Sequence, residues 1–218
     1  NTLVQIEGDG LPHDLRNNQK VVAMTYMTDY TFSYRNYIDE VDYVIFPSKK
    51  FAQFYNLDDS NKNLYFGSPK YKHISDVKKV EDREDYCLYI APRERDKHLV
   101  NEKEIVTILK SLNLRVICKS RRKDMIRNPE IFEHVFYDEQ WYPHDTLELM
   151  RNARLVVNFN STSIKEAIMT QTPIVDFKIK PEMFSKLPFL YEYNFCKNIT
   201  SDKVRDSEYI DKAVKSLL

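Results

Sequence analysis

The chain has 218 residues, and its 42% hydrophobic and 30% charged composition is that of a globular protein rather than a disordered chain. Lysine plus arginine and aspartate plus glutamate both number 33, so the net charge offers no general attraction to nucleic acid or to an anionic membrane. No apolar run approaches the ~20 residues of a membrane span, and the first residues lack the pattern of a signal peptide. We therefore expect a cytoplasmic protein that makes at most peripheral contact with a membrane and does not bind nucleic acid.

Glycine and cysteine exclude several classes of site. The only glycines are Gly8, Gly10 and Gly67, which rules out the glycine-rich phosphate loops of P-loop and dinucleotide-binding proteins. The three cysteines match no metal-ligand spacing. We therefore expect neither a metal nor a cofactor, and a phosphate site in this chain must use hydroxyls, helix ends and cationic side chains.

The first third of the chain has the pattern of part of an α/β unit, with strands expected at 4–7, 21–26, 43–47 and 64–66 and helices at 34–40 and 49–55. The polar loop after the first strand contains His13, the best candidate for a general base, because an imidazole exchanges protons near neutral pH and Asp9 or Asp14 can orient it. A turn formed by glycine, proline and aspartate explains the same residues. Metal ligation by Asp9, His13 and Asp14 is a further alternative.

A charged stretch without apolar periodicity covers 75–85 and is typical of a linker. It divides the chain into a first lobe over 1–74 and a second lobe over 86–218. A lobe of about 70 residues is small beside the usual ~100–150 of an α/β domain. We therefore expect the first lobe to be short or truncated.

The second lobe alternates strand and helix patterns. Strands are expected at 86–91, 114–118, 134–137, 154–159 and 173–177, and the main helices at 101–113, 145–152 and 163–171, with Asn101 as an N-cap and a short helical piece at 129–132. Such alternation predicts a parallel, doubly wound α/β sheet. Ligands of these sheets bind outside the carboxyl ends of the strands.

Cationic side chains follow two of these strands. Arg93 and Arg95 come after the first strand, and Lys119 and Arg121 come after the second. The arginine fork and the lysine point charge both suit a diphosphate. A solvated surface charge is the simpler interpretation of each residue alone. Their convergence on one sheet edge predicts an anion site.

The most informative segment is 156–167, where an apolar strand runs into the hydroxyl-rich turn Ser161, Thr162 and Ser163 and then directly into a helix. Free N–H groups at a helix start attract anions, and Glu166, one turn in, can accept hydrogen bonds from sugar hydroxyls. The pattern Ser163-x-x-Glu166 is also a capping box, which would only satisfy backbone donors. Both interpretations remain open at this point.

Three further residues, Trp141, Tyr142 and Pro143, follow the third strand of the second lobe. They can form the wall of a nucleobase site through stacking or backbone contacts. Packing within the core or a loop explains them equally well, because tryptophan and tyrosine bury readily with one polar end in water.

Four stretches together resemble the glycosyltransferases of the GT-B fold, particularly the branch of CDP-glycerol glycerophosphotransferases and related capsule and wall-polymer enzymes. They are DYVIFPSKKFAQFY…NLYFGSPKY within 42–71, LYIAPRERD at 88–96, RVICKSRRKD at 115–124 and LELMRNARLVVNFNSTSIKEAIMTQTPIVDF at 147–177. Two departures stand out. The Lys-x-His-Pro usual in that branch is absent at Lys119, and Gln171 stands where a helix-ending glycine is common.

The resemblance implies an α/β protein of two Rossmann-like lobes, the first facing the acceptor and the second binding the nucleotide donor. It assigns the donor diphosphate to Ser161, Thr162 and Ser163 and the ribose to Glu166. The implied activity is metal-independent transfer of a sugar from a UDP-, CDP- or GDP-linked donor to a glycan or polyol acceptor. The alternatives are a CDP-glycerol-type polyol-phosphate transferase, a nucleotide-sugar 2-epimerase and a nucleotide-sugar-binding lobe without turnover.

Overall fold

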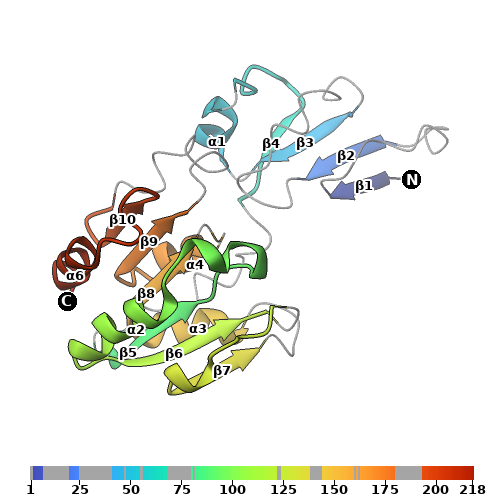
Figure 1. Ribbon diagram of the computed structural model, residues 1–218. Coiled ribbons are helices and arrows are strands. Elements are labelled where there is room, and N and C mark those ends of the chain that lie inside the picture. Colours follow the sequence, from blue (N-terminus) through green and yellow to red (C-terminus); the bar gives the residue numbers. More distant parts are fainter. Residues whose placement is uncertain are drawn as a thin grey trace. The chain divides into compact units, whose positions relative to one another are not determined.

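The chain forms two compact units, Asn1–Ser75 and Asp76–Leu218 (Figure 1). The structure, a computed structural model, describes residues 2–6, 20–24, 41–46, 48–54, 56–67, 80, 82–121, 124–137, 144–159, 161, 163–179 and 193–218. Each unit contains its own parallel sheet. In the described part of the chain no helix is long and apolar enough to cross a membrane.

The first unit contains a four-stranded sheet in the order β1-β2-β3-β4, and every neighbouring pair is parallel. Its strands are β1 (Thr2–Ile6), β2 (Lys20–Met24), β3 (Tyr43–Phe46) and β4 (Asn63–Tyr65), and helix α1 (Lys49–Phe54) connects β3 to β4. These positions agree with the expected strands to within a few residues. Val44, Phe46 and Ala52 are fully buried and form part of its core. The helix expected at 34–40 lies outside the described residues.

The second unit contains a six-stranded parallel sheet in the order β10-β9-β8-β5-β6-β7. The strands are β5 (Glu84–Ile90), β6 (Arg115–Ser120), β7 (His134–Tyr137), β8 (Ala153–Phe159), β9 (Ile174–Lys178) and β10 (Cys196–Thr200). The helices are α2 (Glu102–Ser111), α3 (His144–Asn152), α4 (Ile164–Met169) and α6 (Ser207–Lys215), with 3₁₀ helices at Glu94–Leu99 and Pro129–Ile131. Read from β7, this is the doubly wound order 3-2-1-4-5-6 of a Rossmann sheet, so the predicted fold class is confirmed.

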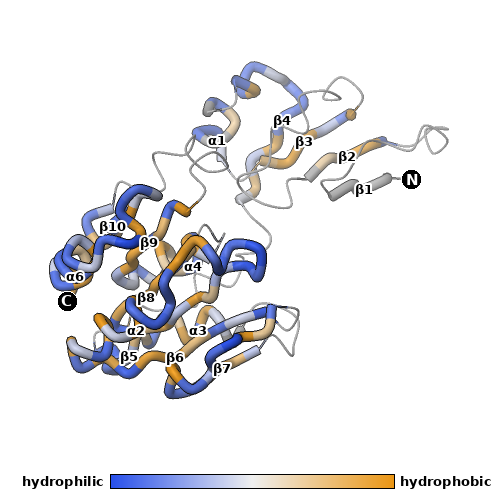
Figure 2. Tube along the Cα trace, viewed as in Figure 1, coloured by the Kyte–Doolittle hydropathy of each residue, from blue (hydrophilic) through white to orange (hydrophobic). Residues whose placement is uncertain are grey.

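The sheet of the second unit is apolar on both faces, as expected for parallel strands covered by helices on each side. One face packs against α2 and α6, where Leu109 and Ile210 join the strand residue Val157. The other face packs against α3 and α4, where Met150 and Ala167 meet the remaining strand side chains. Figure 2 shows hydrophobic colour along β8 and β9, whereas much of α6 has hydrophilic colour.

Some elements differ from the expectation. Strand β5 begins at Glu84, two residues before the expected start, so the end of the stretch expected to be a linker belongs to the sheet. Two elements, β10 and α6, were not predicted from the sequence. Strand β10 is short and carries Lys197 and Asn198 among its five residues, which hides its pattern. Helix α6 has a recognisable signal in Asp206, whose carboxylate accepts the N–H of Tyr209 as an N-cap.

Candidate functional site

The candidate site lies where the strand order of the second unit reverses, between β5 and β8. These two strands are hydrogen-bonded neighbours, yet the chain continues from them toward opposite edges of the sheet. Loops that leave such a pair separate and open a crevice at the carboxyl ends. Strand β5 leads to Arg93 and β8 leads to the turn containing Ser161 and Ser163. The structure therefore brings together, at one end of the sheet, two groups of residues that the sequence predicted for the diphosphate.

The turn after β8 is held by its own hydroxyls. Ser161 Oγ lies 3.1 Å from Ser163 Oγ and accepts the N–H of Ser163 at 3.3 Å. The carbonyl of Ser161 accepts the N–H of Ile164 at 3.2 Å. Ser163 is the N-cap residue of α4, yet its side chain makes no capping bond. The serine half of the predicted capping box is therefore not formed, and both half-exposed hydroxyls remain at the turn.

Helix α4 is shorter than expected, because it ends at Met169 and has only six residues. A helix of this length has a weak macrodipole, so the turn hydroxyls matter more to anion binding than the dipole does. Glu166 sits in its first turn and is 5% exposed. The neighbouring residues Ile164, Lys165 and Ala167 are buried as well. The start of α4 is thus enclosed by the unit, and Glu166 is far less accessible than a surface carboxylate.

The four predicted cations lie after β5 and at the end of β6, but they differ in environment. Arg93 is exposed, whereas Lys119 is only 7% exposed. Arg95 Nε lies 3.7 Å from Asp96 Oδ1, and Arg121 forms an ion pair with a carboxylate oxygen of Asp124. Acidic partners thus offset part of the positive charge at this edge. Of the four, exposed Arg93 fits a contact with a diphosphate best.

Five of the predicted site residues lie outside the described residues. They are His13, the candidate base; Thr162 of the turn; and Trp141, Tyr142 and Pro143, the candidates for the nucleobase site. Their roles stay predictions. In the described part of the chain, no group of three potential metal-ligand side chains occurs.

A buried polar cluster next to the turn was not predicted from the sequence. Asn158 Nδ2 donates to Asp176 Oδ1 at 2.6 Å and to the carbonyl of Ser161 at 3.2 Å, and Lys178 Nζ lies 2.5 Å from Asp176 Oδ2. Burial raises the pKa of Asp176, and the Lys178 ammonium and the Asn158 amide oppose that rise. The signal was a repeated pattern, since Val-Val-Asn-Phe in β8 and Ile-Val-Asp-Phe in β9 each place one polar residue inside an apolar strand.

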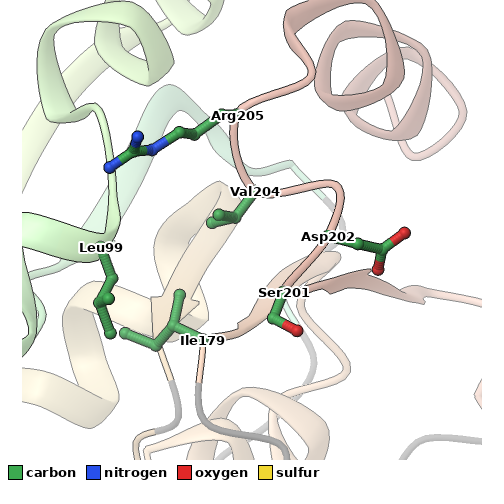
Figure 3. Close-up of a pocket in the computed structure, with 6 residues that line it drawn as sticks. All are labelled: Leu99, Ile179, Ser201, Asp202, Val204 and Arg205. Atoms are coloured by element: carbon green, nitrogen blue, oxygen red, sulfur yellow. The ribbon is translucent and has the colours of Figure 1, made fainter.

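A separate cavity of about 270 Å³ opens near the ends of β9 and β10 (Figure 3). Leu99, Ile179 and Val204 point toward one another as its apolar part, and Arg205 extends along one side, where it donates to the carbonyl of His98 at 3.2 Å. None of the predicted donor-binding residues that the structure describes lines this cavity. Among these residues it is therefore distinct from the candidate diphosphate site.

No protein-family model matches the sequence, and no curated protein matches it. Solved structures do match. The UDP-GlcNAc 2-epimerase of Methanocaldococcus jannaschii, crystallised with UDP-GlcNAc and UDP, has a TM-score of 0.57 and 15% identity, over 91% of this chain and 62% of its own. MurG of Acinetobacter baumannii has a TM-score of 0.54 and 12% identity, over 91% and 58%.

A variant of the wall teichoic acid polymerase TagF matches with a TM-score of 0.58 and 10% identity, over 98% of this chain and 64% of its own. The chain therefore spans about three fifths of the length of these three structures. At such low identity the similarity establishes the fold. The chain has the α/β fold of GT-B proteins, with two Rossmann-like lobes, as the resemblance in sequence implied.

Proposed function

We propose that this GT-B-fold chain is a metal-independent glycosyltransferase, which moves a sugar from a nucleotide-sugar donor to a glycan or related acceptor. One observation carries the proposal. The hydroxyl turn after β8 lies beside the end of β5, at the reversal point of a Rossmann sheet, where such sheets bind nucleotides. The fold of the solved structures supports the same class of activity. We place the reaction in the cytoplasm.

The donor diphosphate binds at Ser161, Thr162 and Ser163, with Arg93 and Arg95 nearby and Lys119 and Arg121 completing the cationic side. During transfer the bond between the sugar and the diphosphate breaks, and negative charge accumulates on the leaving diphosphate. Hydroxyls and fixed cations stabilise that charge without a metal.

The remaining parts of the donor and the acceptor use the other predicted residues. Glu166 accepts hydrogen bonds from the ribose, and Trp141, Tyr142 and Pro143 contact the nucleobase. His13 removes the proton of the acceptor hydroxyl as the new bond to the sugar forms. A UDP-linked sugar is the first donor to test, since the epimerase of similar fold was crystallised with UDP-GlcNAc; CDP- and GDP-linked sugars follow.

Two other enzyme activities have specific support. The similarity to the epimerase favours a nucleotide-sugar 2-epimerase, and the resemblance in sequence to the CDP-glycerol glycerophosphotransferases favours transfer of a polyol phosphate from a CDP-linked donor. A nucleotide-sugar-binding lobe without turnover is the third alternative. The products distinguish these three alternatives from a glycosyltransferase. An epimerase returns an isomer of the nucleotide sugar, a polyol-phosphate transferase releases CMP from CDP-glycerol, and a binding lobe leaves the donor intact.

The first test is a thermal-shift series with UDP-, CDP-, GDP- and dTDP-sugars and CDP-glycerol, each with and without magnesium. A donor at ten times its dissociation constant adds about 1.4 kcal/mol to the free energy of unfolding. We expect this to raise the midpoint by roughly 3–5 °C for one nucleotide, equally with and without magnesium. A shift that requires magnesium, or no shift with any donor, contradicts the proposal.

A double variant tests the assigned residues. Ser163→Ala with Glu166→Ala should abolish the donor-induced shift, because it removes a turn hydroxyl and the ribose acceptor. Since Ser163 makes no capping bond, we expect its loss to cost less than the ~1 kcal/mol of an ordinary cap. Ser216→Ala, which removes a hydroxyl bonded to the carbonyl of Ala213 at the end of α6, is the matched control and should bind donor normally. Normal donor binding by the double variant would reject the assignment.

A further inference from the structure

Three polar residues form a row across β8, β9 and β10, which lie side by side in the sheet (Figure 1). Asn158 is in register with Asp176, and Asp176 is in register with Asn198. Side chains alternate between the faces of a strand, so this row shares a face with Val156 and Ile174, which pack against α3 and α4. The sheet therefore becomes polar on this face one step nearer to its carboxyl edge.

The bonds of this row lead to the turn. Asn158 is fully buried and uses both hydrogens of its amide, one on Asp176 Oδ1 and one on the carbonyl of Ser161. The second oxygen of Asp176 pairs with Lys178. Because a carboxylate only accepts hydrogen bonds from an amide, Asp176 fixes which way the Asn158 side chain points. A continuous chain of contacts thus runs from Lys178 through Asp176 and Asn158 to Ser161.

Packing alone does not account for these residues. Asn158 and Asp176 are 0% and 1% exposed, next to an apolar core that a leucine or valine would extend. The cluster is also imperfectly satisfied, since Asn158 Oδ1 is buried without a hydrogen-bond partner in the described part of the chain. Burying polar groups in this way lowers stability relative to apolar side chains. Residues that break the local pattern at such a cost concentrate at functional sites.

We propose that Asn158 is a positioning residue, which holds the Ser161 turn in the conformation that receives the donor diphosphate, with Asp176 orienting its amide. This inference rests on the proposed function. The carbonyl of Ser161 is fixed from below by Asn158 and from the α4 side by the N–H of Ile164. The two serine hydroxyls are thereby held in place before any ligand arrives, which favours binding because no ordering is needed at that moment.

The test compares two substitutions in the same cluster. Asn158→Ala removes the donor to Ser161, and we expect the affinity for UDP to fall about tenfold or more, as for a misplaced binding group. Asp176→Asn removes the charge that pairs with Lys178 but leaves an amide oxygen to accept from Asn158. It should lower stability, and because an amide at this position no longer fixes which way Asn158 points, the affinity for UDP should fall as well, but by less than in Asn158→Ala.

A second ligand separates positioning from general loosening of the fold. Uridine lacks the phosphates and does not use the turn, so Asn158→Ala should bind uridine as the wild type does, as measured by ligand-observed NMR. If UDP does not bind, the experiment uses the one of CDP, GDP and dTDP that does bind, together with the corresponding nucleoside. If Asn158→Ala does not fold, the double variant Asn158→Leu with Asp176→Asn takes its place. Leucine fills the space of the Asn158 side chain without its amide, and asparagine at position 176 leaves no unpaired carboxylate.

Each possible result either supports or overturns the positioning role of Asn158. Loss of UDP affinity with unchanged uridine affinity supports the positioning role. Equal loss for both ligands, or no loss for either, overturns it and leaves Asn158 with a purely structural role. A wild-type protein that binds none of the four nucleotides overturns the proposed function and this inference together, whereas a wild type that binds UDP and a variant that binds it equally well rejects this inference alone.

Discussion

At the residue scale, the shortage of glycine shows most clearly at the helix ends. The residue after the C-cap has a positive φ at Asn56 (55°), Asn113 (60°) and Gln171 (53°), positions where helices usually carry glycine. At the end of α4 the N–H of Gln171 bonds to the carbonyl of Ile168, and the N–H of Thr172 bonds to that of Ala167, both at 3.0 Å. These are the two bonds of a Schellman motif, closed here by a residue that tolerates the left-handed region poorly.

Gln171→Gly should therefore stabilise the second unit. Removing the Cβ relieves a strain of about 1–2 kcal/mol, and the greater freedom of glycine in the unfolded chain takes back part of it, which leaves a gain of about 0.5–1 kcal/mol. The side chain is exposed, so little packing is lost. Asn113→Gly is the control and should gain less, because asparagine enters this region more readily. Urea titration followed by circular dichroism measures both, and equal gains would contradict the strain argument.

At the element scale, one arginine joins the start of β5 to the ends of α3 and α4. It lies at the amino-terminal end of the strands, opposite the candidate site. Arg83 precedes β5 and donates to the Ala153 carbonyl at 3.2 Å, the Thr172 hydroxyl at 2.6 Å and the carbonyls of Thr170 and Gln171 at 3.2 and 3.0 Å. These groups lie at the ends of α3 and α4, where the helix dipoles favour a cation. Burial lowers the pKa of the guanidinium, which stays charged at neutral pH because arginine starts so high.

Arg83→Ala should lower the free energy of unfolding of the second unit by about 2–3 kcal/mol, because several part-buried carbonyls lose a charged donor at once. Arg83→Lys should recover less than half of that loss, since an ammonium cannot span both helix ends. Arg115→Ala is the matched control. Arg115 also makes two ion pairs, with Glu84 and Glu133, but these are exposed and contribute at most about 0.5 kcal/mol in total. A similar loss in Arg83→Ala and Arg115→Ala would refute this role.

Elements with strong local periodicity could be predicted from the sequence, and those defined by tertiary contacts could not. Helix α2 shows both signals, with Ile105 and Leu109 on one face and Asn101 accepting from Glu104 at its start. The turn after β8 was recognisable because its hydroxyls follow a largely apolar strand. The buried row below it was not, since Asn158 and Asp176 become partners only when β8 and β9 lie in register. Arg83 was likewise assigned to a linker, because charged neighbours surround it in sequence and its acceptors are far along the chain.

At the scale of the whole molecule, the division into two units predicts two unfolding transitions. Each unit has its own sheet and its own buried side chains, so neither requires the other's core to be formed. The residues assigned to the donor diphosphate and ribose belong to the second unit alone. Differential scanning calorimetry of the full chain should therefore resolve two transitions, and the nucleotide that binds should raise only one of them.

Variants identify which transition belongs to which unit. Val44 is fully buried in β3. Val44→Ala should therefore lower the midpoint temperature of the first unit's transition alone, because it reduces the free energy of unfolding of that unit by about 2 kcal/mol. Arg83→Ala should lower only the other transition, which is the one that the nucleotide raises. If a single transition responds to both substitutions and to the nucleotide, the units unfold as one cooperative body. The donor site would then depend on the first unit as well as on the second.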